Sequence, residues 1–559
     1  MGSLRLSWER YNLIYSSSEA TEGSAVEKFT VDSSRLRPDL IGATLEQYTS
    51  EIYSSMKYQR IHFVGIKGAG MTPLAIIAKE AGFNVTGSDI SDVFITDEII
   101  KKMNISVFNG FNKRHVGDVD LVIATGAHGG LNNIEVKTAQ KKGIPVVSQG
   151  EAVGLFMDGK IFGREFVGIS VSGTNGKTTT TAMIATMLKN ADLSPSYIIG
   201  TSFIPSLGYS GHLGKGKYFV AEADEYATDP VFDKTPKFLW QFPKIIVITN
   251  IDFDHPDIYP TINEVKEAFK KFILNLPKDG ALVVFGDDPN VRDILKSFEG
   301  NKITYGKNLK NDYVISDITT ENAKTQFSLK NNKGFDCLFK LSIFGEQNVL
   351  NAAASIAVGS YIGLNSEVLQ KGIALYKGSK RRSEFIGKLS SGAFVFDDYA
   401  HNPSKVSATL KAFKTAYPDK RIVCIFQPHT YSRTKLLFEQ FVNSFDYADT
   451  IIITNIYASL REKKDPTVSS KRLADAIRLS PRRSPFRLRQ SFGGQVGHLR
   501  GGTVFLPKPQ DVVEYIDKKN YGEDTIVITM GAGDVYKIGE SMVGKQKIRN
   551  SKHEIRNKF

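Results

Sequence analysis

The chain has 559 residues, of which 41% are hydrophobic and 23% charged, a composition typical of a globular protein with several domains. No apolar run approaches the roughly 18–20 residues of a membrane span, and the first residues lack the basic-then-apolar order of a secretory signal. The two cysteines, Cys337 and Cys424, lie far apart, which argues against a disulfide framework or a cysteine-based zinc site. We therefore expect a cytoplasmic protein that does not enter a membrane.

The formal net charge of +13 raises the question of nucleic-acid binding. Residues 478–502 hold six arginines and no acidic residue, and residues 545–559 hold six Lys or Arg and one Glu. Most of the net charge thus lies in these two segments, and the rest of the chain is nearly neutral. We do not expect nucleic-acid binding as a main function.

Residues 1–55 are rich in Ser and Glu and show weak periodicity. They predict a leader, which is either an extension or the result of a misplaced gene start, with Met56 as the true first residue. From residue 60 onward, apolar strand patterns alternate with helix patterns, which predicts parallel sheets covered by helices. The fold class expected is therefore α/β.

Three such α/β units follow one another, and we expect domains at 56–160, 161–378 and 379–544, with a basic tail at 545–559. Residues 478–502 interrupt the third unit between a helix pattern, SSKRLADAI, and a strand pattern, TVFLP, that a short loop would normally join. We interpret them as a mobile basic insert, with an arginine-rich interaction arm as the alternative.

The stretch SVSGTNGKTTTT at 170–181 joins a predicted strand to a predicted helix. Gly173 and Gly176 allow a tight turn whose amides point inward, and the helix N-terminus adds positive potential. Lys177 can reach the phosphates and Thr178 can offer its hydroxyl to Mg²⁺. Val171 stands where the full phosphate-loop pattern has glycine, so the match is partial. The pattern predicts a nucleoside triphosphate site.

Two later strands of the second unit end in acidic residues. The first ends in EADEY and the second in NIDFDH, and ligands bind beyond the carboxyl ends of parallel strands. Carboxylates beside a triphosphate are natural Mg²⁺ ligands or bases, although each could instead be a cap or an ion pair. The candidates are Glu222, Asp224, Glu225, Asn250, Asp252, Asp254 and His255.

The first unit has another glycine loop, HFVGIKGAGM, with Gly65, Gly68 and Gly70, and Asp89 ends the next strand. A nicotinamide site, a nucleotide-sugar site and a simple tight turn all fit this pattern. The third unit offers FDDYAHNP and FQPHTYSRT after apolar strands. Arg433 in the second of these can clamp a carboxylate, because a guanidinium matches it bidentately.

Taken together, the motifs resemble those of the Mur ligases, the ATP-dependent amide-forming enzymes of peptidoglycan synthesis. In chain order the motifs are GIKGAGM, GTNGKTTT, EADE, NIDFDH, GEQNVLNAAA, DDYAHNP, PHTYSR and MGAGD, and the resemblance covers roughly 57–477 and 503–540. It implies a Rossmann-like domain that binds UDP, a central ATPase-like domain, and a Rossmann-like C-terminal domain that brings in the amino acid. The implied cofactors are ATP and Mg²⁺.

The resemblance also implies a reaction. The lactyl carboxylate of UDP-N-acetylmuramate attacks the γ-phosphate of ATP, and an amine then displaces phosphate from the acyl phosphate. The PHTYSRT stretch favours L-alanine as the amine, whereas EYATDPVFDKTPKF resembles members that attach the tripeptide L-Ala-γ-D-Glu-meso-diaminopimelate. We expect these small-molecule partners and a monomer or homodimer.

Residue roles are carried over from the family motifs. The implied catalytic residues are Lys177, Glu222 and His255, and the implied metal ligands are Thr178, Glu222 and His255. The implied ATP-binding residues are Gly173, Thr174, Asn175, Gly176, Lys177, Thr178, Thr179, Asn250, Asn348, Arg381, Arg382, Asp397 and Asp398. The implied UDP-sugar-binding residues are Gly65, Gly68, Ala69, Gly70, Met71 and Asp89. The implied amino-acid-binding residues are His401, His429, Tyr431 and Arg433.

Two other classes of function remain as alternatives. A regulatory protein with a decayed site would bind nucleotides without turnover, but the intact Lys177, Glu222 and His255 argue against decay. A nicotinamide oxidoreductase built on Gly65 to Gly70 would leave the phosphate loop unexplained.

Overall fold

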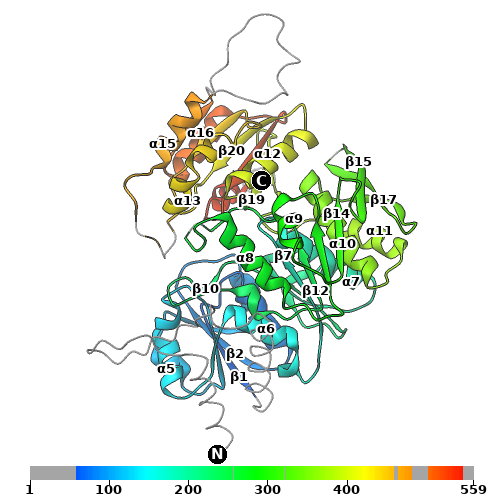
Figure 1. Cartoon of the computed structure of the whole chain (residues 1–559). Helices are drawn as coiled ribbons and strands as arrows, with labels where there is room; N and C mark the ends of the chain where they lie inside the picture. The colour runs from blue at the N-terminus through cyan, green and yellow to red at the C-terminus, as the bar shows by residue number, and fades with distance from the viewer. Residues whose placement is uncertain are drawn as a thin grey trace, which may run out of the picture. The chain divides into compact units, whose positions relative to one another are not determined.

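The computed structural model describes residues 58–255, 257–321, 323–458, 462, 464–480 and 502–544. The expected leader, the basic tail and nearly all of the basic insert lie outside the described residues. The described part contains three separate main sheets, which occupy the blue, green and yellow-to-red ranges of the chain in Figure 1. The expected α/β class, with three units in chain order, is confirmed.

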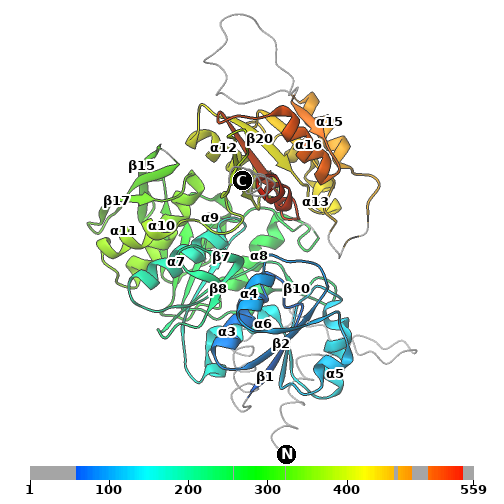
Figure 2. The same ribbon diagram turned by 180° about the vertical axis from the view of Figure 1, so that it is seen from behind.

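The N-terminal sheet has five parallel strands in the order β3-β2-β1-β4-β5. Its strands are β1 (Arg60–Val64), β2 (Asn84–Asp89), β3 (Ser106–Asn109), β4 (Leu121–Ala124) and β5 (Val146–Ser148). Its helices are α3 (Thr72–Glu80), α4 (Asp97–Lys102), α5 (Ile134–Lys141) and α6 (Gln149–Asp158), with short 3₁₀ turns η1 (Lys113–Val116), η2 (Gly130–Asn132) and η3 (Lys160–Phe162). Figure 2 shows α3 and α4 with the central strands β1 and β2. The order reverses beside β1, which places the loop after β1 at the switch point where such sheets bind ligands.

The middle domain holds a ten-stranded sheet in the order β17-β16-β15-β14-β13-β12-β6-β9-β7-β8. Its central strands are parallel: β6 (Val167–Ser172), β7 (Ser196–Ile204), β9 (Tyr218–Glu222), β12 (Ile245–Ile248), β13 (Ala281–Phe285) and β14 (Lys302–Gly306). Antiparallel pairing adds β8 (Gly208–His212) at one edge. At the other edge β15 (Tyr313–Glu321) pairs with β14 in parallel, and β16 (Lys324–Asn331) and β17 (Asp336–Leu341) follow in antiparallel order. A separate hairpin pairs β10 (Ala227–Asp229) with β11 (Asp233–Pro236).

The helices of the middle domain are α7 (Lys177–Asn190), α8 (Ile262–Ile273), α9 (Pro289–Leu295), α10 (Glu346–Tyr361) and α11 (Ser366–Leu375), with the 3₁₀ turn η4 (Lys237–Trp240). Nearly all of α7 is buried, because α10 and α11 pack against it from outside the sheet. Small residues allow this close packing: a Cβ at Gly372 would lie 2.9 Å from the Cα of Met187. The buried α7 gives the phosphate loop at its start a fixed support.

The C-terminal sheet has six strands in the order β18-β19-β23-β20-β21-β22. The strands are β18 (Glu384–Lys388), which is antiparallel, and the parallel β19 (Phe394–Asp398), β20 (Arg421–Phe426), β21 (Thr450–Ile453), β22 (Thr503–Phe505) and β23 (Thr525–Met530). The helices are α12 (Pro403–Ala416), α13 (Tyr431–Leu436), α14 (Phe438–Val442), α15 (Ser470–Leu479) and α16 (Pro509–Lys519). The helix and strand expected on either side of the basic insert are thus present as α15 and β22.

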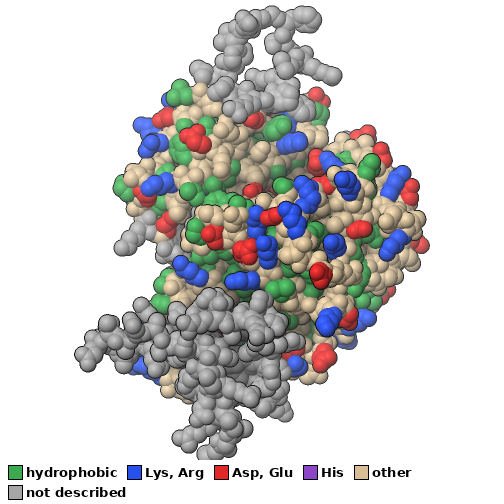
Figure 3. Space-filling model, viewed as in Figure 1, with side chains coloured by type: hydrophobic (Ala, Val, Ile, Leu, Met, Phe, Trp, Pro, Cys, Tyr) green, Lys and Arg blue, Asp and Glu red, His purple; other side chains and the backbone are tan. Residues whose placement is uncertain are grey.

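Within the described residues, no helix is both long enough and apolar enough to cross a membrane. The face shown in Figure 3 carries Lys and Arg interspersed with Asp and Glu, not gathered into one basic patch. Each domain has its own apolar core between sheet and helices, such as the cluster around Phe441 and Phe445 in the C-terminal domain. The domain boundaries proposed from the sequence stay predictions.

Candidate functional site

The predicted phosphate loop lies between β6 and α7, as expected. Gly173 and Gly176 have φ values of +126° and +88°, a region that favours glycine. The loop is held from β12: the Asn175 N–H donates to Asn250 Oδ1 at 2.8 Å, and the Thr249 hydroxyl donates to the Asn175 carbonyl at 2.5 Å. The side chain of Asn250 therefore acts here by holding the loop in shape.

Lys177 is the first residue of α7 and turns back over the loop. Its Nζ donates to the Gly173 carbonyl at 2.7 Å and forms an ion pair with Glu225 at 2.7 Å. Burial alone would lower the pKa of Lys177, but Glu225, Asp224 and Glu222 together raise it. The ammonium is therefore charged at neutral pH and lies where phosphates would meet the loop amides.

Glu222 ends β9 beside the start of α7. Thr178 donates its hydroxyl to Glu222 at 3.2 Å, and the Gly200 N–H donates to the other carboxylate oxygen at 2.5 Å. Burial raises the pKa of Glu222. The Thr178 hydroxyl and the Glu222 carboxylate together form a set of oxygen donors that suits Mg²⁺, which prefers oxygen ligands.

His255 lies on the loop after β12 with φ of +60°. Its imidazole faces Glu225, with 3.9 Å between Nε2 and Oε1, and lies 4.7 Å from the Tyr226 ring. Glu225 Oε1 is buried and has no hydrogen-bond partner among the described residues. Thr178 and Glu222 are thus adjacent, whereas His255 faces Glu225, and the described residues form no ready cluster of three or more metal-ligating side chains. The set of metal ligands stays a prediction. Glu225 was a candidate from the strand-end pattern and is not in the set implied by the family motifs, but its buried Oε1 is an available oxygen donor.

Asp254, the residue before His255, connects the middle domain to the C-terminal domain. Its carboxylate accepts from Asn402 at 3.1 Å, Lys405 at 3.4 Å and Arg433 at 3.2 Å. Burial alone would raise its pKa, but His255, Lys405 and Arg433 hold that pKa well below its usual range. The sequence marked Asp254 as a candidate Mg²⁺ ligand or base, whereas the structure binds its carboxylate to side chains of the C-terminal domain. The sequence marked Asn402 only as a member of a motif and gave no signal for Lys405.

Three of the four predicted amino-acid-binding residues, His401, His429 and Arg433, lie near this carboxylate. Arg433 donates from Nη1 to His429 Nδ1 at 3.3 Å, and its buried Nε has no hydrogen-bond partner among the described residues. Burial and the Arg433 charge lower the pKa of His429 to about 4, and burial and Lys405 hold that of His401 well below its usual range. Both imidazoles are therefore neutral at pH 7. Tyr431 begins α13, and its N–H donates to Glu462.

The adjacent arginines 381 and 382 point to different places. Arg381 turns into its own domain, where it pairs with Asp397 at 2.9 Å and donates to the Gly531 carbonyl at 2.6 Å. Arg382 instead reaches across to the phosphate loop, donating to the Thr178 hydroxyl at 3.0 Å. Of the two, Arg382 is the one beside the predicted ATP site.

Asp397 and Asp398 lie at the end of β19 and are engaged within the C-terminal domain. Asp397 also accepts from Thr529 at 2.7 Å, and burial raises its pKa to about 6. Asp398 accepts from the Ser383 N–H at 2.8 Å and the Ala400 N–H at 2.8 Å. Both side chains brace the loops around Arg382, and their contact with ATP stays a prediction.

Asn348 lies near the start of α10, where its amide donates to the Phe344 carbonyl at 2.7 Å. Asn351, which the sequence reasoning missed, lies one turn further and contacts the phosphate loop: a Cβ at Gly176 would lie 2.3 Å from its Oδ1. The spacing of three residues, which places both side chains on one helix face, was the available signal.

The N-terminal glycine loop follows β1. Gly65 has φ of +79°, and a Cβ there would lie 2.4 Å from Thr125. Asp89 holds this loop by accepting from the Lys67 N–H at 2.8 Å, and it lies 3.5 Å from the His128 imidazole. Gly68, Ala69, Gly70 and Met71 follow directly and lead into α3. Their role in binding UDP stays a prediction.

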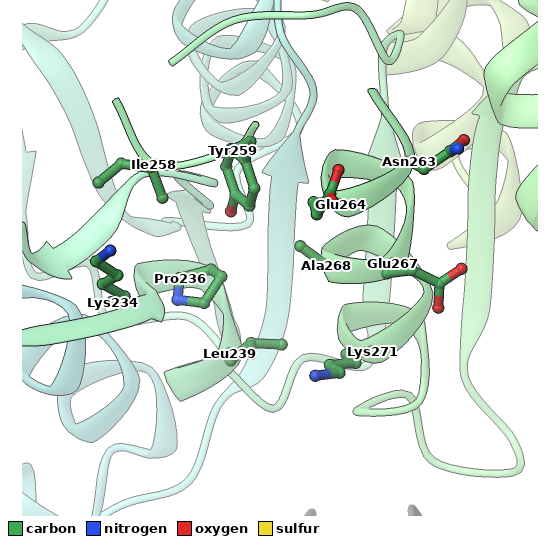
Figure 4. A pocket seen from close by; sticks show the side chains of 10 residues that line it. All are labelled: Lys234, Pro236, Leu239, Ile258, Tyr259, Asn263, Glu264, Glu267, Ala268 and Lys271. Atoms are coloured by element: carbon green, nitrogen blue, oxygen red, sulfur yellow. The ribbon is translucent and has the colours of Figure 1, made fainter. Parts of the chain in front are cut away.

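A surface pocket of about 360 Å³ opens between β11 and α8 (Figure 4). Lys234 and Pro236 lie on one side and Ala268 on the other, with the Tyr259 ring at one end (Figure 4). The Tyr259 hydroxyl donates to the Glu225 carbonyl at 2.5 Å, so the pocket adjoins the segment that carries Glu225. No residue of the phosphate loop lines it, so the pocket is separate from the predicted ATP site.

Family models match three consecutive parts of the chain. They are the Mur ligase family, catalytic domain at 60–161, the Mur ligase middle domain at 171–359, and the Mur ligase, glutamate ligase domain at 381–533. The chain is 40% identical to the UDP-N-acetylmuramate–L-alanine ligase of Caldanaerobacter subterraneus subsp. tengcongensis, over 88% of this chain and 98% of the relative. The chain therefore belongs to the Mur ligase family.

Solved structures agree with this assignment. The UDP-N-acetylmuramate–alanine ligase of Thermotoga maritima is 26% identical with a TM-score of 0.70, and the match covers 88% of this chain and all of that one. A murein peptide ligase from Psychrobacter arcticus shares the fold, with a TM-score of 0.61 and 23% identity over 87% of this chain and 98% of that one. The resemblance inferred from the motifs is confirmed.

Proposed function

We propose that the chain is an ATP-dependent ligase that joins L-alanine to the lactyl carboxylate of UDP-N-acetylmuramate in peptidoglycan synthesis. The reaction must bring a triphosphate and two carboxylate-bearing substrates together. The observation that carries the proposal is a largely buried group of four cations, Lys177, Arg382, Lys405 and Arg433, drawn from two domains. Burial lowers the pKa of Lys405, and Lys177, Arg433 and Arg382 lower it further against the opposing effect of Asp254. Such mutual repulsion favours an anionic ligand among these side chains.

The phosphoryl step is assigned to the middle domain. Lys177 and the loop amides after Gly173 bind the phosphates of ATP and stabilise the charge that develops on the transferred group. The proposed holders of Mg²⁺ are Thr178, Glu222 and His255, and the ion would neutralise phosphate charge there. Arg382 adds a second cation from the C-terminal domain beside Thr178.

The amide-forming step is assigned to the boundary with the C-terminal domain. Arg433 has a buried Nε free among the described residues, and a buried donor without a partner costs about 1–3 kcal/mol. The carboxylate of L-alanine would satisfy it. The neutral imidazole of His401 donates from Nδ1 to the Tyr399 carbonyl at 2.9 Å, so its Nε2 can accept a hydrogen bond from the incoming amine. His429 already accepts from Arg433 at Nδ1, so its Nε2 is a donor. We place the reaction in the cytoplasm, with a monomer or homodimer as the active form.

The test measures phosphate released from ATP with Mg²⁺ and UDP-N-acetylmuramate, comparing L-alanine, the tripeptide L-Ala-γ-D-Glu-meso-diaminopimelate and no amine. We expect release that requires both L-alanine and the nucleotide sugar. Release with the tripeptide alone would contradict L-alanine as substrate while keeping the chemistry. Binding of ATP without release in any mixture would favour a regulatory protein.

A further inference from the structure

One buried carboxylate receives three side chains from the neighbouring domain. Asp254 follows β12 in the middle domain, and its side chain is only 3% exposed. Asn402 at the start of α12, Lys405 within α12 and Arg433 in α13 all donate to it, at 3.1, 3.4 and 3.2 Å. Two of these donors, Lys405 and Arg433, are cations, so side chains of the C-terminal domain compensate the negative charge of Asp254.

Asn402 shows why the contact with α12 is directional. Its Oδ1 caps the helix by accepting from the Lys405 N–H at 2.9 Å and from the Ser404 hydroxyl at 3.1 Å. Capping requires the carbonyl oxygen, so the amide NH₂ must face the other way, toward Asp254. The side chain that begins α12 is therefore also the one that fastens the helix to the middle domain.

Arg433 is the second side chain whose orientation depends on Asp254. One N–H of Nη2 is used by Asp254 and one of Nη1 by His429, and the buried Nε has no hydrogen-bond partner within the described part of the chain. Because the guanidinium is planar, fixing it at two corners also fixes the directions of its remaining donors, Nε–H among them. Without Asp254, this long side chain would lose its anchor on the middle domain.

Asp254 Oδ1, the oxygen that accepts from Arg433, also accepts from the backbone N–H of His255, at 2.9 Å. Oδ1 thus joins Arg433 on the amino-acid side to the loop that carries His255, whose imidazole faces Glu225. We propose that Asp254 is a positioning residue: it holds Arg433 in place for the amino-acid carboxylate and fastens α12 and α13 over the phosphate loop. The proposal rests on the ligase function proposed above and adds a residue to its amino-acid site.

Asp254→Asn tests the proposal, because it keeps the shape and removes the charge. Losing a charge-assisted hydrogen bond to Arg433 should raise the KM for L-alanine roughly 10- to 100-fold. The KM for ATP should change less than about threefold, because Lys177 and the phosphate loop keep their own contacts. A structural defect would instead lower kcat or raise both KM values together.

The matched control is Asp293→Asn. Asp293 also pairs with two cations, Lys266 at 2.9 Å and Lys296 at 3.0 Å, but all three lie in the middle domain. This variant should keep wild-type values of both KM constants. A rise in the KM for L-alanine in the control equal to that of Asp254→Asn would overturn the assignment.

Asn402→Ser covers the case in which Asp254→Asn does not fold. Serine caps a helix as well as asparagine does, but it offers no NH₂ to Asp254. We expect its KM for L-alanine to rise about 3- to 10-fold with a smaller change for ATP. A wild-type KM for L-alanine in a folded Asn402→Ser protein would contradict the proposal.

A double-mutant cycle shows whether Asp254 acts through Arg433. If it does, Asp254→Asn combined with Arg433→Gln should lose little more than Arg433→Gln alone. Fully additive losses would refute the coupling. Wild-type turnover is measured in the same assay: an inactive wild type would reject the ligase function, whereas an active wild type with unaffected variants would reject only the role of Asp254.

Discussion

The pair formed by Lys177 and Glu225 gives a prediction in which stability and catalysis can be separated. The two charges are 2.7 Å apart, and their side chains are only 15% and 3% exposed. Removing one partner of a buried ion pair costs about 3–5 kcal/mol, because the other charge stays buried without compensation. Lys177→Met should therefore lower the free energy of unfolding of the middle domain by about that amount.

The same substitution should also remove a cation from the transferred phosphoryl group. The loss of one preorganised donor at a developing charge lowers kcat by about 10²- to 10³-fold. A single variant cannot tell the two effects apart. In the double variant Lys177→Met with Glu225→Gln, both charges are gone, so stability should return to within about 1 kcal/mol of wild type. Turnover should stay at the level of Lys177→Met.

Urea unfolding and amine-dependent phosphate release, measured on the three proteins, give the two quantities side by side. Binding of UDP-N-acetylmuramate should survive in all three, because its predicted site begins at Gly65 in the N-terminal domain. Recovery of more than about a tenth of wild-type turnover in the double variant would refute the catalytic role of Lys177. A Lys177→Met protein as stable as wild type would refute the energetic role of the pair.

Two further substitutions test the loop and the histidines. Gly176→Ala should lower the free energy of unfolding by about 1–2 kcal/mol because of its φ of +88°, and should raise the KM for ATP because its Cβ would lie 2.3 Å from Asn351 Oδ1. The control is Gly82→Ala, where φ is +91° and the space around the Cβ is open, so only the backbone strain should appear. An unchanged KM for ATP in Gly176→Ala would contradict the contact with Asn351. Folding lowers the pKa of His429 from 6.5 to about 4, so between these pH values the imidazole is neutral in the folded protein and protonated in the unfolded chain. The contribution of neutral His429 to stability is therefore complete above pH 6.5 and is lost as pH falls toward 4. Between pH 8 and pH 5 this loss amounts to about 2 kcal/mol, so urea midpoints should fall less steeply in His429→Gln than in wild type, and parallel curves would exclude the buried neutral histidine.

The parts of the site predicted from the sequence are those fixed by local chain geometry. Gly173 and Gly176 specify the loop, and apolar strands on either side place Glu222 and Asn250 at the same edge of the sheet. Because a strand end and the next helix start are set by neighbours in the chain, motif and periodicity were enough to find them.

Contacts between domains could not be read in the same way. Nothing in the sequence relates Asp254 to Lys405, about 150 positions further on, because their contact depends on how two separately folded domains meet. Arg381 and Arg382 were equally good candidates for the same reason. Arg381 has a φ of +62°, a conformation that cannot be predicted from the sequence at a residue other than glycine. This turn directs the guanidinium of Arg381 into its own domain and that of Arg382 toward Thr178.

The loop after β12 shows how much of the site depends on one short segment. The Asp252 N–H bonds the Thr174 hydroxyl of the phosphate loop at 2.8 Å, Asp254 receives Arg433 from the C-terminal domain, and His255 faces Glu225. Three residues within four positions thus contact the phosphate loop, Arg433 of the C-terminal domain and the acidic segment at the end of β9. A shift of this loop by one residue would break all three contacts. The spacing within NIDFDH is therefore set at the same time by Thr174, Arg433 and Glu225. The motif is therefore constrained by the meeting of two domains as well as by any metal that His255 binds.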